Sequence, residues 1–214
     1  MGTHTTELTP ARFVRRPHPL RRAVGSFLLP RPAGEITLTF DDGPHPEYTP
    51  AVLDRLREHR LRATFFVIGR KIPAAADVLR ACHHAGHRLG NHTATHPRPT
   101  WTGFASAHRE LAECQRAVTE TTGAAPTLFR PPLGKWTLPL RLACRRHGLR
   151  PMNWTLDSCD WKVRSDADAD RCADEMLAAV RLGDTLLLHD YHPWIGRILD
   201  VLLPELSGRS PAPV

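Results

Sequence analysis

The chain alternates between two kinds of apolar pattern from residue 35 onward. Short apolar runs rich in β-branched and aromatic residues predict strands at residues 36–40, 63–68, 88–91, 127–130, 151–156 and 185–189. Between these runs, apolar residues recur at helical spacing, as in Leu111, Cys114 and Val118, and a glycine such as Gly123 follows the helical segment. Repeated strand–helix units predict a parallel sheet covered by helices, either an open α/β sheet or a βα barrel.

The two ends of the chain lack this periodicity. We predict a basic, arginine-rich N-terminal extension over residues 1–34, one domain over residues 35–205 and C-terminal coil over residues 206–214. The net charge of +7 makes nucleic acid, anionic lipid and acidic glycan candidate partners for the extension. Because nothing in it reads bases, we predict a solvated arm with no nucleic-acid partner and leave weak contact with a membrane surface open.

Export and oxidation signals are also weak. No run approaches the roughly 18 apolar residues of a membrane span. The best signal-peptide candidate, residues 23–29, stops at Pro30 and has no small-residue cleavage site after it. The five cysteines form no CxxC pair, which argues against a disulfide framework or a structural zinc site and favours reduced thiols. We therefore predict a cytoplasmic protein, with secretion left open.

Ionisable side chains follow most of the predicted strands. In both architectures the functional groups gather at the C-terminal ends of the strands. Five of the six strand ends carry such groups: Asp41 and Asp42, His92, Arg130, Asp157 and Asp160, and His189 with Asp190. Charges scattered over a surface would not favour these positions so consistently, so we predict one site at this end of the sheet.

The first two segments suggest a metal site. Of two carboxylates directly after a strand, Asp41 and Asp42, one can bind a cation while the other stays free as a base. Histidines four residues apart, His92 and His96, can face one metal ion, although a chain with 13 histidines produces such pairs by chance. With a strand-end aspartate they form a set with open positions that suits zinc and also admits cobalt. A polar turn after the first strand is the alternative interpretation.

The other three segments each have a functional and a purely structural interpretation. The loop from Arg130 to Gly134 is stiffened by two prolines and can aim a main-chain N–H at an oxyanion, or it is a plain turn. The acidic groups beside Trp154 and Trp161 can orient a catalytic group and offer a sugar-stacking face, or they cap a buried tryptophan pair. His189 is either functional or a satisfied core histidine.

Taken in order, the five segments resemble the polysaccharide deacetylase family, also called the NodB-homology domain or carbohydrate esterase family 4. The family signatures T-F-D-D-G-P, H-[ST]-x-x-H, R-x-P-x-G, D-x-x-D-W and L-L-x-H all match, and the resemblance covers roughly residues 35–205. It implies a distorted βα barrel. The chain ends where relatives usually add a closing strand, so we expect the barrel to lack it.

The resemblance also implies the ligands and the groups that transfer protons. By motif position, Asp42, His92 and His96 would bind one divalent metal ion, most simply zinc. Asp41 would be the general base that activates a water, and His189 would be the general acid.

Five further residues receive supporting roles from the resemblance. Arg130 would hold Asp41, and Asp160 would hold His189. The main-chain N–H of Leu133 would contact the oxyanion, although the family usually has an aromatic residue there. Trp161 would form part of the pocket wall, and Leu187 would line the pocket for the acyl methyl group.

The implied activity is hydrolysis of the N-acetyl group of an amino sugar. The substrate would be an N-acetylated carbohydrate: an N-acetylglucosamine-type glycan, an oligosaccharide or a small glycoside. One alternative is a deformylase or deacetylase of an amino sugar linked to a lipid carrier. Another is an inactive glycan-binding module, which the retention of every catalytic residue disfavours.

Overall fold

A computed structural model describes residues 34–98 and 103–209 of the chain. Its centre is one sheet whose strand pairs are all parallel. The strand order is β5-β4-β3-β2-β1-β7-β6. The strands are β1 (Thr37–Gly43), β2 (Ala63–Val67), β3 (Arg88–Asn91), β4 (Leu128–Phe129), β5 (Arg150–Pro151), β6 (Leu156–Asp157) and β7 (Thr185–His189). The predicted N-terminal arm lies almost wholly outside the described residues.

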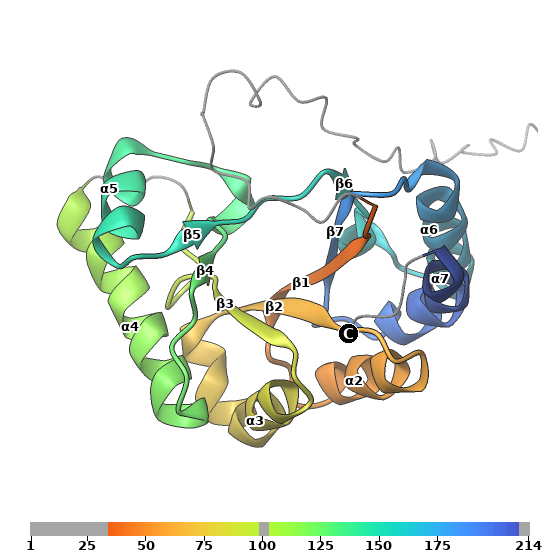
Figure 1. Cartoon of the computed structure of the whole chain (residues 1–214), viewed down its shortest axis with the longest axis horizontal. Helices are drawn as coiled ribbons and strands as arrows, with labels where there is room; N and C mark the ends of the chain where they lie inside the picture. The colour runs from red at the N-terminus through yellow and green to blue at the C-terminus, as the bar shows by residue number, and fades with distance from the viewer. Residues whose placement is uncertain (1–33, 99–102, 210–214) are drawn as a thin grey trace, which may run out of the picture.

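Helices surround the outside of the curled sheet (Figure 1). The α-helices are α2 (Tyr48–Glu58), α3 (Ala76–His84), α4 (Phe104–Thr122), α5 (Leu138–Arg146), α6 (Asp166–Ala179) and α7 (Ile195–Arg209). Three short 3-10 helices interrupt the loops: η1 (Gly69–Ala75), η2 (Pro132–Gly134) and η3 (Asp160–Lys162). None of the helices in the described ranges is long and apolar enough to cross a membrane.

Alternation along β1 separates the core from the site. Leu38 and Phe40 are buried in the main apolar cluster, which also contains residues of the surrounding helices. Thr39 and Asp41 point to the opposite face of the sheet because successive strand residues alternate. Both are buried, and both accept a hydrogen bond from one arginine, Arg130. The inner face of the curled sheet is therefore polar at its centre.

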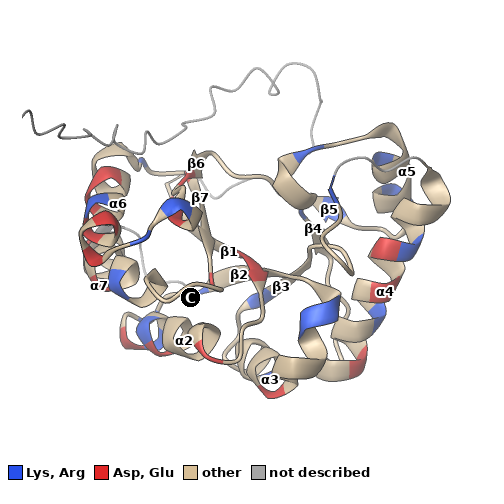
Figure 2. Cartoon of the chain, turned by 180° about the vertical axis from the view of Figure 1, so that it is seen from behind, with Lys and Arg blue, Asp and Glu red and all other residues tan. Residues whose placement is uncertain are grey.

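Surface ion pairs connect the outer helices. Figure 2 shows acidic and basic residues interspersed along the helices, with both signs on α6. Arg197 of α7 bonds to Asp166 and Asp170 of α6, and Arg55 of α2 bonds to Asp200 of α7. Exposed pairs of this kind contribute about 0–1 kcal/mol each, so the buried apolar cluster rather than these charges holds the helices to the sheet.

The strand predicted at residues 151–156 is instead two strands at opposite edges of the sheet. β5 pairs with β4, and β6 pairs with β7. The residues between them cross from one edge to the other, where the Arg130 guanidinium donates to the carbonyls of Met152 and Asn153. A side chain thus supplies donors that a neighbouring strand would otherwise provide. The sheet order ends at β5 and β6, so the barrel is open, as predicted.

The last helix runs further than the sequence suggested. α7 continues to Arg209, so the prediction of coil from residue 206 is wrong for residues 206–209. Leu206 is buried in the main apolar cluster seven residues after Leu199, which is helical spacing. Pro204 is exposed, on the side of the helix that faces away from this cluster. Burial of Leu206 therefore accounts for the extra helical turn.

Candidate active site

The C-terminal end of β1 turns two neighbouring aspartates toward different partners. The pairing of β1 with β2 skips a residue between Asp41 and Gly43, and Asp42 has a left-handed backbone with φ of 72°. A bulge of this type re-aims a side chain and recurs next to active sites. Gly43 is required beside it because a Cβ there would collide with the carboxylate of Asp190.

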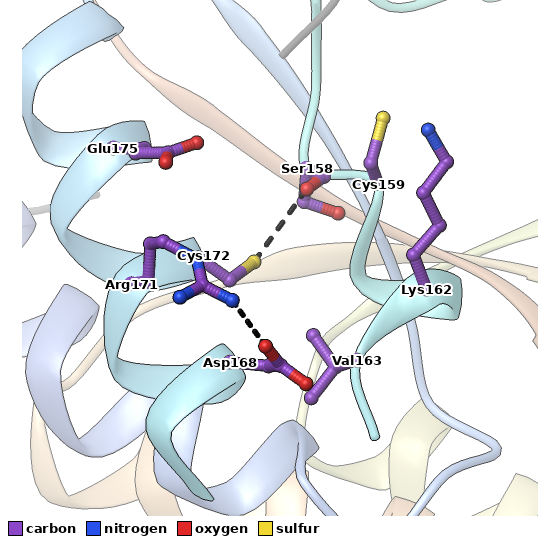
Figure 3. A pocket seen from close by; sticks show the side chains of 8 residues that line it. All are labelled: Ser158, Cys159, Lys162, Val163, Asp168, Arg171, Cys172 and Glu175. Carbon is purple, nitrogen blue, oxygen red and sulfur yellow. Dashed lines mark hydrogen bonds and ion pairs between the residues drawn. The ribbon is translucent and has the colours of Figure 1, made fainter. Parts of the chain in front are cut away.

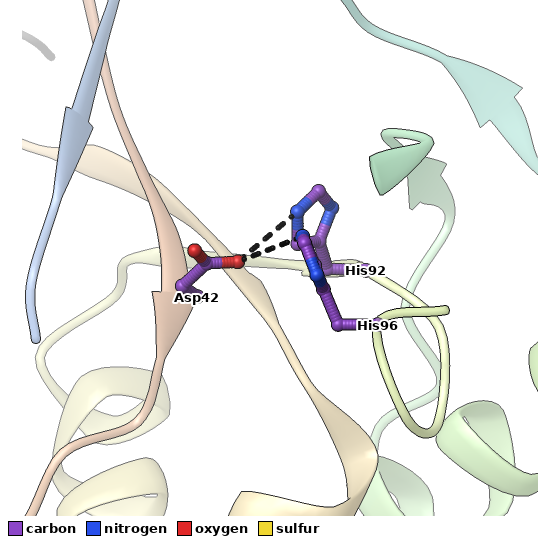
Figure 4. A group of neighbouring side chains, drawn as sticks. All are labelled: Asp42, His92 and His96. Carbon is purple, nitrogen blue, oxygen red and sulfur yellow. Dashed lines mark ion pairs between the residues drawn. The ribbon is translucent and has the colours of Figure 1, made fainter. Parts of the chain in front are cut away.

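Asp42 faces the two histidines of the predicted metal set (Figure 4). The Nε2 atoms of His92 and His96 lie 3.4 Å and 3.3 Å from the same oxygen, Asp42 Oδ1. The potential ligand atoms of the three residues all lie within 4.8 Å of one another. Asp42 Oδ1 is buried and has no hydrogen-bond partner among the described residues. The main-chain oxygen of Arg130 lies 2.7 Å from His92 Nδ1, which favours the tautomer with a bare Nε2.

The charges of this group are arranged for a cation. Burial raises the pKa of Asp42, but His92, His189 and His96 outweigh burial and hold that pKa well below its ordinary value. Burial lowers the pKa of His92, but the Asp41 and Asp42 carboxylates outweigh it and raise that pKa. Burial lowers the pKa of His96. A metal ion here would replace a proton on His92, as metal binding to imidazole generally does.

A second aspartate, Asp160, is surrounded by donors. The ring Nδ1 of His189 lies 2.6 Å from Asp160 Oδ1, and the main-chain N–H of His189 donates to Oδ2 at 2.7 Å. Nε2 of His192 lies 3.2 Å from the same Oδ2. Burial lowers the pKa of His189, but Asp160 above all raises it, to about 9. This carboxylate therefore orients His189 and favours its protonated form.

Arg130 occupies the polar interior between these groups. It is fully buried, and its Nη1 donates to Asp41 Oδ1 at 2.6 Å and to Thr39 Oγ1 at 2.8 Å. Its guanidinium lies over the ring of Phe66 at 4.2 Å and that of Trp154 at 5.4 Å. A buried guanidinium that is stacked and bonded on several sides has little freedom, so it fixes the position of Asp41.

The remaining predicted residues lie around this centre in different environments. Leu133 has a left-handed backbone with φ of 57°, half of its side chain is exposed, and its N–H takes part in no hydrogen bond within the described ranges. Trp161, next to Asp160 in η3, is 47% exposed and has the Lys162 ammonium over its ring. Leu187 is buried in β7 and pairs with Thr39 of β1.

Three residues at the site were not predicted from the sequence. His192 contacts Asp160, Lys71 donates to the main chain of Asp42, and Tyr191 packs edge-on against His189. His192 follows His189 by three residues, so the run His-Asp-Tyr-His was the available signal. Lys71 had no such signal, because only the fold brings η1 beside β1.

A hollow between η3 and α6 is separate from this centre (Figure 3). Its walls include Ser158 and Cys172, whose thiol donates to the Ser158 carbonyl at 3.5 Å, and the exposed ion pair of Arg171 with Asp168. It contains none of the Asp and His residues described above, so it is not where the reacting groups meet.

Comparisons with known proteins identify the family of the chain. A family model described as polysaccharide deacetylase matches residues 29–152. A chitooligosaccharide deacetylase from Bradyrhizobium sp. (strain ANU 289) is 39% identical over 159 residues, which are 74% of this chain and 71% of that protein. Peptidoglycan-N-acetylglucosamine deacetylase PgdA from Listeria monocytogenes (serotype 1/2a, strain 10403S) is 34% identical over 175 residues, 82% of this chain but only 36% of that protein.

The fold comparison leads to the same family. The structure of peptidoglycan deacetylase PdaC from Bacillus subtilis matches with a TM-score of 0.76 and 30% identity, covering 83% of this chain and 85% of that one. The chain belongs to the polysaccharide deacetylase family. Members of this family are in general metal-dependent, and Asp42, His92 and His96 form the candidate metal site of this chain.

Proposed function

We propose that the protein is a metal-dependent deacetylase that removes N-acetyl groups from an amino sugar of the N-acetylglucosamine type. The proposal depends mainly on the buried Asp42 Oδ1, which faces two histidine nitrogens and has no hydrogen-bond partner among the described residues. The names of the similar proteins, which act on chitooligosaccharides and on peptidoglycan N-acetylglucosamine, support the choice of substrate.

The three residues fit one divalent ion. They would supply one oxygen and two nitrogen ligands, a set that suits zinc with positions left for water and substrate and that also accepts cobalt. When bound, such an ion lowers the pKa of a water and polarises the amide carbonyl.

The neighbouring groups would take a proton from the attacking water and stabilise the oxyanion that forms from the amide. Asp41, adjacent to the ligand Asp42 but turned toward Arg130, accepts the proton of the attacking water. Arg130 holds Asp41 in place through the hydrogen bond that its Nη1 donates to Asp41 Oδ1. The N–H of Leu133, unpaired within the described ranges, would donate to the oxyanion as it forms.

His189 would complete the reaction by protonating the departing amine. A pKa raised to about 9 keeps the ring protonated at neutral pH, so a proton is available when the carbon–nitrogen bond breaks. Asp160 positions the ring through its Nδ1. The products are acetate and a free amino sugar.

The proposed substrate contacts follow from exposure for Trp161 and from motif position for Leu187. Trp161 presents an exposed ring beside Asp160 and would face the sugar. Leu187 would line the small pocket for the acetyl methyl group. With Leu133 in place of the aromatic residue usual in the family, the loop after β4 offers the sugar an aliphatic contact.

A screen of substrates tests the proposal. The zinc-loaded protein would be incubated with chitooligosaccharides, muropeptides, UDP-N-acetylglucosamine, small N-acetylglucosaminides and a formamido sugar on a lipid carrier, while acetate and formate are measured. Acetate from one of the first four substrates supports the proposal. Formate alone would favour the deformylase alternative. Glycan binding without either product would favour an inactive binding module.

A further inference from the structure

The main-chain oxygen of Asp42 lies outside the sheet ladder. The pairing of β1 with β2 passes from Asp41 to Gly43, and its pairing with β7 ends at Asp41. A partly buried carbonyl without a ladder partner needs another donor. Lys71 supplies it, with its Nζ 2.7 Å from the Asp42 oxygen. A side chain from η1, 29 residues later in the chain, thus closes the bulge that aims Asp42 at the histidines.

The same ammonium group contacts the other side of the site. Lys71 Nζ lies 5.3 Å from the centre of the Tyr191 ring, within the range of a cation–π interaction. The Tyr191 ring in turn meets the His189 ring edge-on, with centroids 5.4 Å apart and planes at 70°. Lys71 and Tyr191 therefore join Asp42 to His189 through direct contacts.

We infer that Lys71 and Tyr191 are positioning residues for the deacetylation proposed above, on which this inference rests in part. Lys71 fixes the left-handed bulge that presents Asp42 to His92 and His96. Tyr191 fixes the Lys71 ammonium and the ring of His189 relative to each other.

Because Lys71 is positively charged, a positioning role and a purely electrostatic role predict opposite changes in metal affinity when it is removed. A positive charge beside the candidate metal site repels a divalent cation. If Lys71 were only a nearby charge, its removal would tighten metal binding. If it positions Asp42, its removal loosens binding, since loss of a group that orients a metal ligand typically costs about 10–100-fold in affinity.

The experiment measures the zinc affinity of the metal-free full chain by competition with a chromophoric chelator. We expect Lys71→Met to bind zinc about 10–100-fold more weakly than the wild type and Lys71→Arg, which keeps a charged donor, to recover most of the loss. Arg70→Met is the matched control, because Arg70 is the exposed neighbour of Lys71 and carries the same charge. Thermal unfolding of each metal-free variant confirms that it is folded. Unchanged or tighter binding by folded Lys71→Met would overturn the inference.

The role of Tyr191 has its own readout. Tyr191→Leu should lower kcat more than it changes KM, and Tyr191→Phe, which keeps the ring, should recover most of the lost kcat. Equal kinetics for the two variants would contradict the role of the ring. The zinc measurement needs no substrate, so weaker binding by Lys71→Met supports the positioning of Asp42 even if the screen for acetate release fails. Failure of the wild type to bind zinc would overturn both proposals.

Discussion

Two clusters of one aspartate and two histidines flank the same site. They differ in the hydrogen bonds that the carboxylate of the aspartate accepts. In the first, Nε2 of His92 and of His96 both lie 3.3–3.4 Å from one oxygen of Asp42, which forms no hydrogen bond within the described ranges. In the second, Asp160 has three nitrogen neighbours, at 2.6 Å, 2.7 Å and 3.2 Å.

The comparison shows that residue types alone do not decide the chemistry of such a cluster. Histidines outweigh burial and lower the pKa of both Asp42 and Asp160, so both carboxylates are charged. The two aspartates differ in how many lone pairs of their carboxylate oxygens accept hydrogen bonds. Both oxygens of Asp160 have nitrogen neighbours from His189 or His192, and Asp160 serves to hold His189 in place. The buried Oδ1 of Asp42 has no hydrogen-bond partner among the described residues and faces two imidazoles, which is an arrangement for a cation.

The largest expected effect comes from removing a candidate metal ligand from the first cluster. His96→Ala removes one of two nitrogen ligands, so we expect the purified variant to lose its metal and all detectable turnover. Metal analysis of wild type and variant, each at equal protein concentration, checks this. One equivalent of metal retained undiminished by the variant would show that the ion is bound elsewhere.

The adjacent aspartates should separate metal binding from proton transfer. Asp41→Asn should keep metal and fold but lose about 10²–10⁴-fold in kcat, the usual cost of removing a general base. Asp42→Asn should weaken metal affinity, and excess metal should partly restore its activity. Metal content and turnover of both variants are measured side by side. If Asp41→Asn loses the metal while Asp42→Asn keeps it and loses only turnover, the two roles are reversed.

The second cluster should control the response to pH. His189 acts as an acid only when protonated, and Asp160 raises its pKa to about 9 against the lowering effect of burial. Turnover should therefore fall as the pH rises through the pKa of His189. Asp160→Asn removes the charge, burial then dominates, and the basic limb should move to lower pH with a loss of turnover at pH 8. NMR titration of His189 in the metal-free proteins gives the shift directly. An unmoved pKa would contradict this role of Asp160.

Much of the fold and of the site could be predicted from local sequence. Strand-end positions predicted that Asp42 and His92 lie together, because the C-terminal ends of neighbouring parallel strands meet, and the four-residue spacing from His92 added His96. The family signatures implied the distorted βα barrel. Both signals are short-range: each depends on a strand and the few residues after it.

Features that depend on tertiary contacts could not be predicted in this way. Residues 151–156 look like one apolar strand, and only Arg130, bonding to the crossing segment, shows why they split. The bulge at Asp42 is invisible in the sequence, and so is Lys71, which closes it from another element. The end of α7 was missed because Leu206 is buried by packing, although the sequence around it contains Pro204 and Gly208.

The smallest expected effect comes from His192, the second histidine on Asp160. Its Nδ1 is buried and has no hydrogen-bond partner within the described ranges, while its Nε2 lies 3.2 Å from Asp160 Oδ2. His192→Phe keeps a ring against Tyr191 and removes both nitrogens. Asp160 Oδ2 still accepts the main-chain N–H of His189, so no acceptor is orphaned, and loss of an unsatisfied nitrogen should leave the melting temperature unchanged or higher.

The kinetic consequence of His192→Phe has the opposite sign to that of Asp160→Asn. With one donor fewer, more of the negative charge of Asp160 is available to His189, which raises the pKa of His189. We expect the basic limb to move to higher pH, with kcat at pH 7 almost unchanged. Paired pH profiles of the two variants measure both shifts. A downward shift for His192→Phe would mean that His192 holds Asp160 in position rather than sharing its charge, and the two histidines of this cluster would then act as one unit.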